Sequence, residues 1–302
     1  MGFYKKIKSV GAQQKCAGTF LVLWQRYLMM KLRLCIDTGF IKSYTFYWKC
    51  DVNRIWLQKA CLIGGILVMK TIGLIGGMSW ESTVTYYQIL NRVVKDKLGG
   101  LHSAKCLLYS VDFQEIEECQ ANGEWEKSGH ILTEAAKTLE KAGADFIIIC
   151  TNTMHKVVPQ IEKEIEIPIL HIAKAAAVEL RRQGIEKAGL LGTKYTMQQE
   201  FYKENLKEKQ VDVIVPDIQD MEIINSVIYQ ELCQGNISEK SKKEFLRIID
   251  GLMKKGAQGI ILGCTEIGLL VKQEDTKIPV FDTTYIHARQ AAMLAMEERV
   301  LI

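Results

Sequence analysis

The chain has 302 residues, of which 48% are hydrophobic and 25% are charged. These values are ordinary for a globular protein; they exclude collagen-like, low-complexity and largely disordered chains, and the length favours two domains. The formal net charge of +4 conceals two unlike segments, because residues 1–68 carry 11 basic side chains but only two acidic ones. The remaining 28 basic and 33 acidic side chains give residues 69–302 a net charge of −5.

Residues 1–68 also differ from the rest of the chain in composition. They contain no Glu, Pro or His. Their apolar runs at 17–24 and 60–68 are shorter than the about 20 residues that a membrane span needs. Basic residues interleaved with aromatic ones would suit a nucleic-acid-binding arm. A simpler hypothesis is that upstream DNA is read in frame and the working protein begins at Met69, because Ile-Gly-Gly at 63–65 can be encoded with a ribosome-binding sequence.

From residue 70 onwards, short apolar runs alternate with amphipathic stretches. In chain order, the apolar runs predict strands at 71–75, 104–110, 146–150, 169–172, 188–191, 211–215, 259–262 and 280–281. The stretches between them predict helices at 81–97, 127–142, 173–182, 197–208, 238–255 and 286–299. This alternation indicates an α/β fold with parallel sheets, in which ligands bind beyond the carboxyl ends of the strands.

An internal repeat divides residues 69–302 into two related halves. Three pairs of segments match in the same order, 111–116 residues apart: 70–77 with 186–193, 141–151 with 254–264, and Ile-Pro at 167–168 with Ile-Pro at 278–279. We therefore expect two α/β domains that face each other about a pseudo-twofold axis, with a site between them. The first comprises residues 69–172 and 277–302, and the second comprises residues 173–276.

The repeat aligns Thr151 with Cys264, each at the end of an apolar strand and before a helix. Since a helix N-terminus favours anions, we expect a carboxylate-binding cleft there, and a Cys264 thiol whose pKa lies below its usual value of about 8.5. Two opposed groups beside a bound carboxylate can remove a proton from one face of a carbon and return one to the other face. This arrangement predicts a racemase with Thr151 and Cys264 as its acid–base groups.

Other candidate groups fit structural roles or supporting contacts. Cys150 comes one residue before the aligned position, so its side chain should point into the core. His155 is expected to be a capping or core histidine, while Thr193 and Thr196 could contact a ligand. The loop at 73–79 lacks the Gly-x-Gly-x-x-Gly pattern, and the nine cysteines show no metal-ligand spacing. We therefore expect no cofactor and no metal, with reduced cysteines typical of a cytoplasmic protein.

Five segments carry a family resemblance: Gly-Gly-Met-Ser-Trp-Glu-Ser-Thr at 76–83, Ser-Val-Asp-Phe at 110–113, Cys-Thr-Asn-Thr-Met-His at 150–155, Gly-Thr-Lys-Tyr-Thr-Met at 192–197 and Gly-Cys-Thr-Glu-Ile-Gly at 263–268. With these motifs, residues 69–302 resemble the aspartate/glutamate racemases, a family of cofactor-independent amino-acid racemases. The match is especially close to the bacterial L-aspartate/glutamate-specific and broad-specificity branch. The resemblance implies two Rossmann-like domains with the active site between them.

The resemblance also implies which residues act. The family usually pairs two cysteines as catalytic bases; Cys264 is the second here, and Thr151 takes the place of the first, as in the branch where threonine occupies that position. Cys233 stands where some aspartate racemases carry a basic residue for the side-chain carboxylate of the substrate. The residues that would line the substrate site are Met78, Gln120, Asn152, Thr153, Thr265 and Glu266.

We therefore expect cofactor-independent racemisation of aspartate or glutamate by two-base proton transfer at Cα. Two alternatives stay open. One is a related racemase or isomerase that acts on neutral amino acids, hydantoins or maleate; the other is a protein that binds an acidic amino acid without turning it over. The expected partner is a small-molecule amino acid rather than a nucleic acid or a membrane, and a homodimer is common in the family.

Overall fold

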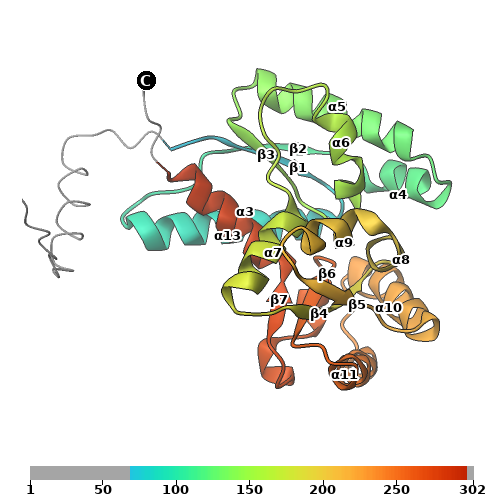
Figure 1. Ribbon diagram of the computed structural model, residues 1–302. Helices are drawn as coiled ribbons and strands as arrows, with labels where there is room; N and C mark the ends of the chain where they lie inside the picture. Colours follow the sequence, from blue (N-terminus) through green and yellow to red (C-terminus); the bar gives the residue numbers. More distant parts are fainter. Residues whose placement is uncertain (1–68, 298–302) are drawn as a thin grey trace, which may run out of the picture. The chain divides into compact units, whose positions relative to one another are not determined.

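Two parallel sheets organise residues 69–297, the part of the chain that the computed structural model describes (Figure 1). The first sheet has the order β2-β1-β3, built from β1 (Ile72–Gly76), β2 (Cys106–Ser110) and β3 (Phe146–Ile149). The second has the order β5-β4-β6-β7, built from β4 (Lys187–Gly192), β5 (Asp212–Ile214), β6 (Gly259–Gly263) and β7 (Val280–Asp282). The predicted α/β class with parallel sheets is confirmed. Our hypothesis about residues 1–68 and the end of the predicted helix 286–299 lie outside the described residues.

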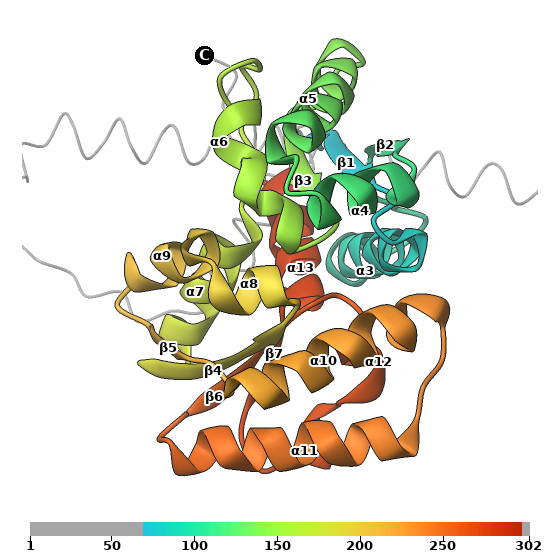
Figure 2. The same ribbon diagram turned by 90° about the vertical axis from the view of Figure 1, so that its right-hand side faces the viewer.

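Helices pack on both faces of each sheet, and the strands that they bury, β1, β3, β4 and β6, read as continuous apolar runs. The edge strands β2 and β5 stay partly exposed. On the first sheet, α3 (Trp80–Leu98) and α13 (Thr283–Ala295) cover one face, and α5 (Trp125–Lys141) with α6 (Val158–Ile161) covers the other. On the second sheet, α7 (Ile172–Arg182) and α9 (Glu200–Lys207) cover one face. The opposite face packs on α10 (Ile218–Gln230) and α11 (Glu239–Lys254), as Figure 2 shows.

Shorter elements lie in the connections between the strands and the longer helices. They are η1 (Thr153–Val157), α8 (Lys194–Gln198), η2 (Leu232–Gln234), α12 (Ile267–Leu270) and η3 (Gln273–Asp275). The helix α4 (Phe113–Ala121) lies between β2 and α5 in the chain. No helix within residues 69–297 is both long enough and apolar enough to span a membrane.

The two halves repeat the same backbone hydrogen bonds. The N–H of Ile147 donates to the carbonyl of Pro168 over 2.9 Å, and the N–H of Ile260 donates to the carbonyl of Pro279 over 2.9 Å. Likewise, the N–H groups of residues 145 and 258 both donate over 2.8 Å, to the carbonyls of residues 71 and 187. The segments matched in the sequence therefore occupy matching places in the two sheets.

The structure differs from the predicted elements in three respects. The predicted strand 169–172 is a single parallel bridge from Ile169 to Ile147, because α7 already begins at Ile172. The helices α4 and α10 were not predicted, although each begins at an Asp whose side chain accepts a backbone N–H bond. Finally, β7 pairs with β6 in the second sheet although we assigned its residues to the first domain, while α13 packs on both α3 and α7.

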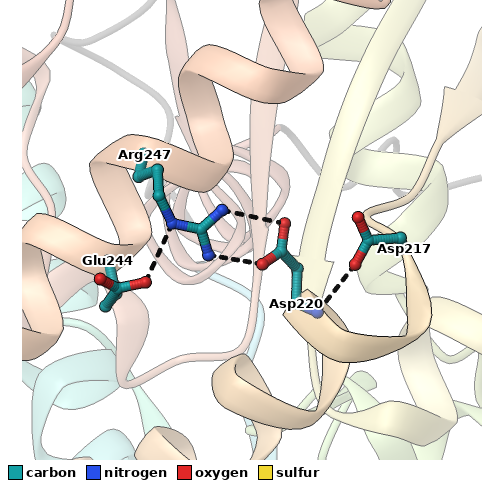
Figure 3. Close-up of polar contacts among 4 residues, drawn as sticks. All are labelled: Asp217, Asp220, Glu244 and Arg247. Atoms are coloured by element: carbon teal, nitrogen blue, oxygen red, sulfur yellow. Dashed lines mark hydrogen bonds and ion pairs between the residues drawn. The ribbon is translucent and has the colours of Figure 1, made fainter.

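Charged side chains tie α10 to α11 at the surface of the second half (Figure 3). The guanidinium of Arg247 on α11 donates to the Asp220 carboxylate over 2.5 and 3.4 Å and to Glu244 over 3.0 Å. Asp217, which caps α10, accepts the N–H of Asp220 over 3.0 Å. These contacts link α11 to α10, the helix that carries one wall of the site described next.

Candidate active site

A pocket lies where the carboxyl ends of strands from both sheets meet. The residues that line it at these ends are Thr151, Asn152, Thr153, Thr193, Gly263, Cys264 and Glu266. The rest of the lining comes from Met78 before α3, from α4, and from α10 with η2: Met78, Phe113, Gln120, Ile228, Tyr229 and Cys233. The space between these side chains is about 360 Å³, part of it open to solvent.

The predicted site residues are brought together, although their roles remain predictions. Of the eight residues predicted for catalysis or substrate binding, all but Thr265 line the pocket. Thr265 lies directly behind the lining, because its hydroxyl donates to Glu266 over 2.7 Å. Thr193, the candidate ligand contact, lines the pocket, and Thr196 is hydrogen-bonded behind it.

A buried carboxylate is the centre of the second half of the site. Glu266 is 4% exposed, and its Oε1 accepts hydrogen bonds from Ser79 over 2.8 Å and Ser82 over 2.7 Å. Its Oε2 accepts from Thr265 over 2.7 Å and from the Cys264 thiol over 2.9 Å. Four neutral donors thus surround one negative charge, and two of them come from the N-terminus of α3 in the first half, a place that itself favours an anion.

The Cys264 thiol has a higher pKa than we predicted from sequence. Burial and the negative charge of Glu266 raise the pKa of this thiol well above its ordinary value. The expected lowering by a helix N-terminus was wrong, because α12 is only four residues long and begins three residues beyond Cys264. A thiol hydrogen-bonded to a carboxylate nevertheless has a proton acceptor 2.9 Å away.

Neutral histidines lie behind Thr151 in the first half of the site. The N–H of Ile172 donates to Nε2 of His155 over 3.1 Å, so the ring proton is on Nδ1, which donates to the carbonyl of Thr151 over 2.8 Å. Burial and the neighbouring His171 and His287 hold the pKa of His155 well below its usual range. His155 therefore has the expected capping role, and it fixes the backbone that carries Thr151.

Asn152 offers a buried acceptor in the pocket. Thr283 donates its hydroxyl proton to the carbonyl of Leu262 over 2.7 Å, so its oxygen accepts from Nδ2 of Asn152 over 3.1 Å. This assigns the amide orientation and leaves Oδ1 of Asn152, which has no hydrogen-bond partner among the described residues. A buried carbonyl oxygen of this kind suits a ligand N–H group.

Hydroxyl groups from both halves also meet at the pocket. Oγ1 of Thr153 lies 3.1 Å from Oγ1 of Thr193, which lies 3.2 Å from Oγ1 of Thr196. Such hydroxyls can turn their protons toward an anion. They are the neutral donors available to a ligand carboxylate at the strand ends.

Cys150 lies in the core, as predicted. It is fully buried and packs with Tyr86, Leu74 and Ile148 in the cluster under α3 and α13. Burial raises the pKa of its thiol far above the usual range. This cysteine does not line the pocket.

Sequence reasoning did not identify five residues that build the site. Ser79 and Ser82 bind Glu266, and Phe113, Ile228 and Tyr229 line the pocket. A signal existed for Ser79, which follows a glycine turn and caps a long helix, but its contact with the second half is visible only in the folded chain. Within residues 69–297, no group of three His, Cys, Asp or Glu side chains is placed to hold a metal ion.

Comparisons with known proteins agree on one family. The family model for Asp/Glu/hydantoin racemases matches residues 75–291. The crystal structure of a Yersinia pestis protein assigned as an Asp/Glu racemase is 56% identical, with a TM-score of 0.72, and the match covers 76% of this chain and 100% of that one. An aspartate racemase homologue from Pyrococcus horikoshii OT3 is 39% identical, with a TM-score of 0.67 and coverage of 76% and 100%.

Curated relatives match over shorter stretches. The broad specificity amino-acid racemase RacX of Bacillus subtilis (strain 168) is 28% identical over 153 residues, which are 51% of this chain and 66% of that protein. A glutamate racemase of Aquifex pyrophilus is matched over 53% of its length. The chain thus spans about half to two thirds of these curated relatives. Together, the matches support amino-acid racemisation as the class of reaction.

Proposed function

The chain belongs to the Asp/Glu/hydantoin racemase family, and on this premise we propose that it racemises an amino acid, without a cofactor, by two-base proton transfer at Cα. Cys264 and Thr151 are the acid–base groups, one on each face of the substrate. The observation that carries the proposal is the Cys264 thiol, which donates to the buried Glu266 carboxylate in the pocket that Thr151 also lines.

The α-ammonium and α-carboxylate of the substrate bind to neutral groups. The ammonium donates to Oδ1 of Asn152, the buried acceptor that has no partner among the described residues. The carboxylate accepts from the hydroxyls of Thr153 and Thr193, which come from different halves. Both contacts hold groups that every amino acid carries, so they orient Cα without selecting a side chain.

Cys264 and Glu266 share one proton and one negative charge. Transfer of the thiol proton to Oε2 of Glu266 produces a thiolate and a carboxylic acid, so the net charge of the buried pair stays the same. The thiolate then takes the Cα proton from one face. The Thr151 hydroxyl gives its proton to the opposite face, which completes the inversion; solvent then returns a proton to Thr151 and takes the one left on Glu266. In the reverse direction Cys264 donates the proton.

Exchange of the Cα hydrogen in deuterated water tests this proposal. The wild-type chain should exchange and invert at least one amino acid, while Cys264→Ala should do neither and Thr151→Ala should be strongly impaired. Cys150→Ala is the matched control, because it removes a neighbouring thiol that does not line the pocket.

Two outcomes would contradict the assignment. Substantial racemisation in Cys264→Ala would exclude Cys264 as a base. A dead Cys150→Ala beside a fully active Thr151→Ala would move the second base to Cys150. Binding without any Cα exchange would instead favour a protein that senses an amino acid.

The family name makes aspartate and glutamate the first substrates to test, as the sequence also suggested. However, proton transfer at Cα uses only groups that all amino acids share. The choice of side chain depends on a different part of the pocket.

A further inference from the structure

The wall of the pocket away from the strand ends is built by helices rather than by the strands. Its side chains are Phe113, Gln120, Ile228, Tyr229 and Cys233, and Met78 from the loop between β1 and α3 completes this part of the lining. Phe113 and Gln120 come from α4 in the first half, whereas Ile228, Tyr229 and Cys233 come from α10 and η2 in the second. These residues take no part in the proposed chemistry at Cα, so they surround the place left for the substrate side chain.

This helical wall is mainly apolar. Ile228 is 1% exposed and belongs to the hydrophobic core of the second half, against which Tyr229 and Cys233 also pack. Met78 belongs to the core of the first half, and Phe113 packs against that core. A side chain bound here leaves water for an apolar environment, which is favourable for uncharged groups and costly for an ionised one.

The polar groups in the wall are neutral. The hydroxyl of Tyr229 donates to Oε1 of Gln120 over 3.4 Å, a long hydrogen bond, and Nε2 of Gln120 donates to the sulfur of Met154, a weak acceptor. Both donors could therefore turn to a better acceptor on a substrate. They can pair with an amide, a hydroxyl or a thioether without adding charge.

The charge inside the pocket is already negative. Among the described residues that line it, the charged side chain is Glu266, and none is Lys, Arg or His. Burial, with added repulsion from Cys264 for Tyr229 and from Glu266 for Cys233, raises the pKa of both wall residues well above the usual range. The environment of the wall thus opposes a further negative charge.

From this wall we infer that the pocket selects amino acids with uncharged side chains over aspartate and glutamate. The inference rests on the proposed racemase function. An amino acid with a neutral side chain enters as a zwitterion and leaves the net charge of the pocket unchanged. Aspartate or glutamate brings a second carboxylate to an apolar wall beside Glu266, where the described lining offers no cation to pair with it.

Isosteric substrate pairs test the inference on the full wild-type chain. Glutamine and asparagine match glutamate and aspartate in size and differ in charge, and methionine adds an apolar side chain of similar length. Cα exchange in deuterated water and inversion on a chiral column give kcat/KM for each L-enantiomer. We expect each amide to exceed its acid by at least about 100-fold, because the acid leaves a buried charge unpaired.

A cation in the wall should reverse this preference. Cys233→Arg places a guanidinium beside Tyr229 and should raise the ratio of glutamate to glutamine turnover at least about tenfold relative to wild type. Cys233→Met is the matched control, since it adds a long neutral side chain at the same place and should not favour the acid. The wild-type panel decides the matter even if the arginine variant fails to fold.

The outcomes separate this inference from the proposed function. Exchange of amides and methionine with little exchange of the acids supports both. Exchange of aspartate or glutamate at rates equal to or above those of their amides overturns the inference and leaves the racemase function intact. Exchange of no amino acid in the panel overturns the proposed function, and this inference with it.

Discussion

The ends of β3 and β6 occupy matching places in the two halves but hold opposite chemistry. Behind Thr151 lie His155, His171 and His287, which burial keeps neutral. Behind Cys264 lies Glu266, a buried carboxylate with four donors. The backbone hydrogen bonds of the repeat are the same in both halves, so the asymmetry is confined to side chains. It follows that one half of the site holds a charge beside its acid–base group, while the histidines behind Thr151 in the other half stay neutral.

Replacing Glu266 with Gln removes the negative charge of the second half of the site and should cause the largest change in activity. The change keeps the size of the side chain but removes the acceptor for the Cys264 proton, so racemisation at pH 7 should fall at least about 100-fold in both directions. The residual activity should rise with pH, because the thiol must then lose its proton to solvent. Initial rates for both enantiomers from pH 6 to 10 give the measurement.

The opposite result for Glu266→Gln is equally informative. The negative charge of Glu266 also raises the pKa of the Cys264 thiol. If the variant racemises faster than wild type, the carboxylate opposes the thiolate rather than accepting its proton. Near-ultraviolet circular dichroism controls for the fold, because the substitution removes an acceptor from buried hydroxyls.

The neutral histidines of the first half should make the fold sensitive to acid. Burial lowers the pKa of His171 to about 3 and that of His287 to about 4, below the ordinary value near 6.5. The unfolded chain therefore binds protons that the folded chain cannot bind. Stability is complete above about pH 6.5 and declines as the pH falls toward 4, by at least about 3 kcal/mol in total at pH 4.5.

Urea unfolding at pH 7.0, 5.5 and 4.5 measures this decline. His171→Asn is a matched variant, because Asn can also cap α7, where Nδ1 of His171 accepts the N–H of Ala173, but it does not titrate. The variant should lose about one third less stability between pH 7.0 and 4.5 than wild type. Equal losses in the two proteins would show that His171 gains its proton as readily in the folded chain as in the unfolded one.

The sequence predicted much of the fold because four strands, β1, β3, β4 and β6, are buried and because the repeat presents the same pattern twice. Two helices escaped prediction for different reasons. The segment of α4 is only nine residues long, and α10 is rich in Ile and Val, which also suit a strand. Since α4 and α10 meet across the pocket, the wall that faces the substrate side chain could not be assembled from sequence.

The sequence predicted which residues lie at the site but not the raised pKa of the Cys264 thiol. The positions of Thr151, Asn152 and Cys264 follow from the strand ends, which periodicity locates well. The raised pKa of the Cys264 thiol depends on burial and on a neighbouring carboxylate, and both are tertiary facts. The contacts from Ser79 and Ser82 to Glu266 join residues more than 180 positions apart in the chain, so no local pattern encodes them.

Replacing Thr151 with Cys should make proton transfer at the two faces of Cα more nearly equal in rate. A threonine hydroxyl has no accessible pKa near neutrality, whereas a thiol does. Thr151→Cys should raise kcat for the slower enantiomer about tenfold. The ratio of the two kcat/KM values stays near one, because the free enantiomers have equal free energy.

Two further substitutions at this position test the role of the hydroxyl. Thr151→Ser keeps the hydroxyl and should retain most of the activity. Thr151→Val keeps the shape but lacks the hydroxyl, and it should resemble Thr151→Ala. A Thr151→Val variant as active as Thr151→Ser would show that the proton on this face comes from water or another group.

The smallest effect should come from removing a single hydrogen bond or ion pair in the second half. The loss of stability should be larger where the bond is buried. Ser82→Ala removes a 2.7 Å bond to Oε1 of Glu266 inside the protein, where Ser79 remains as a donor. Because hydrogen bonds to buried charges matter more than neutral ones, and because Ala favours the helix slightly, the net loss of stability should be about 1 kcal/mol.

Arg247→Met breaks the pair with Asp220 on the surface of the same half, where the Arg247 side chain is 52% exposed, and should cost less than about 0.5 kcal/mol. Urea unfolding of both variants at pH 7 measures the two losses. A surface loss equal to or above the buried one would mean that the tie between α10 and α11, rather than the carboxylate that joins the halves, stabilises this side of the site.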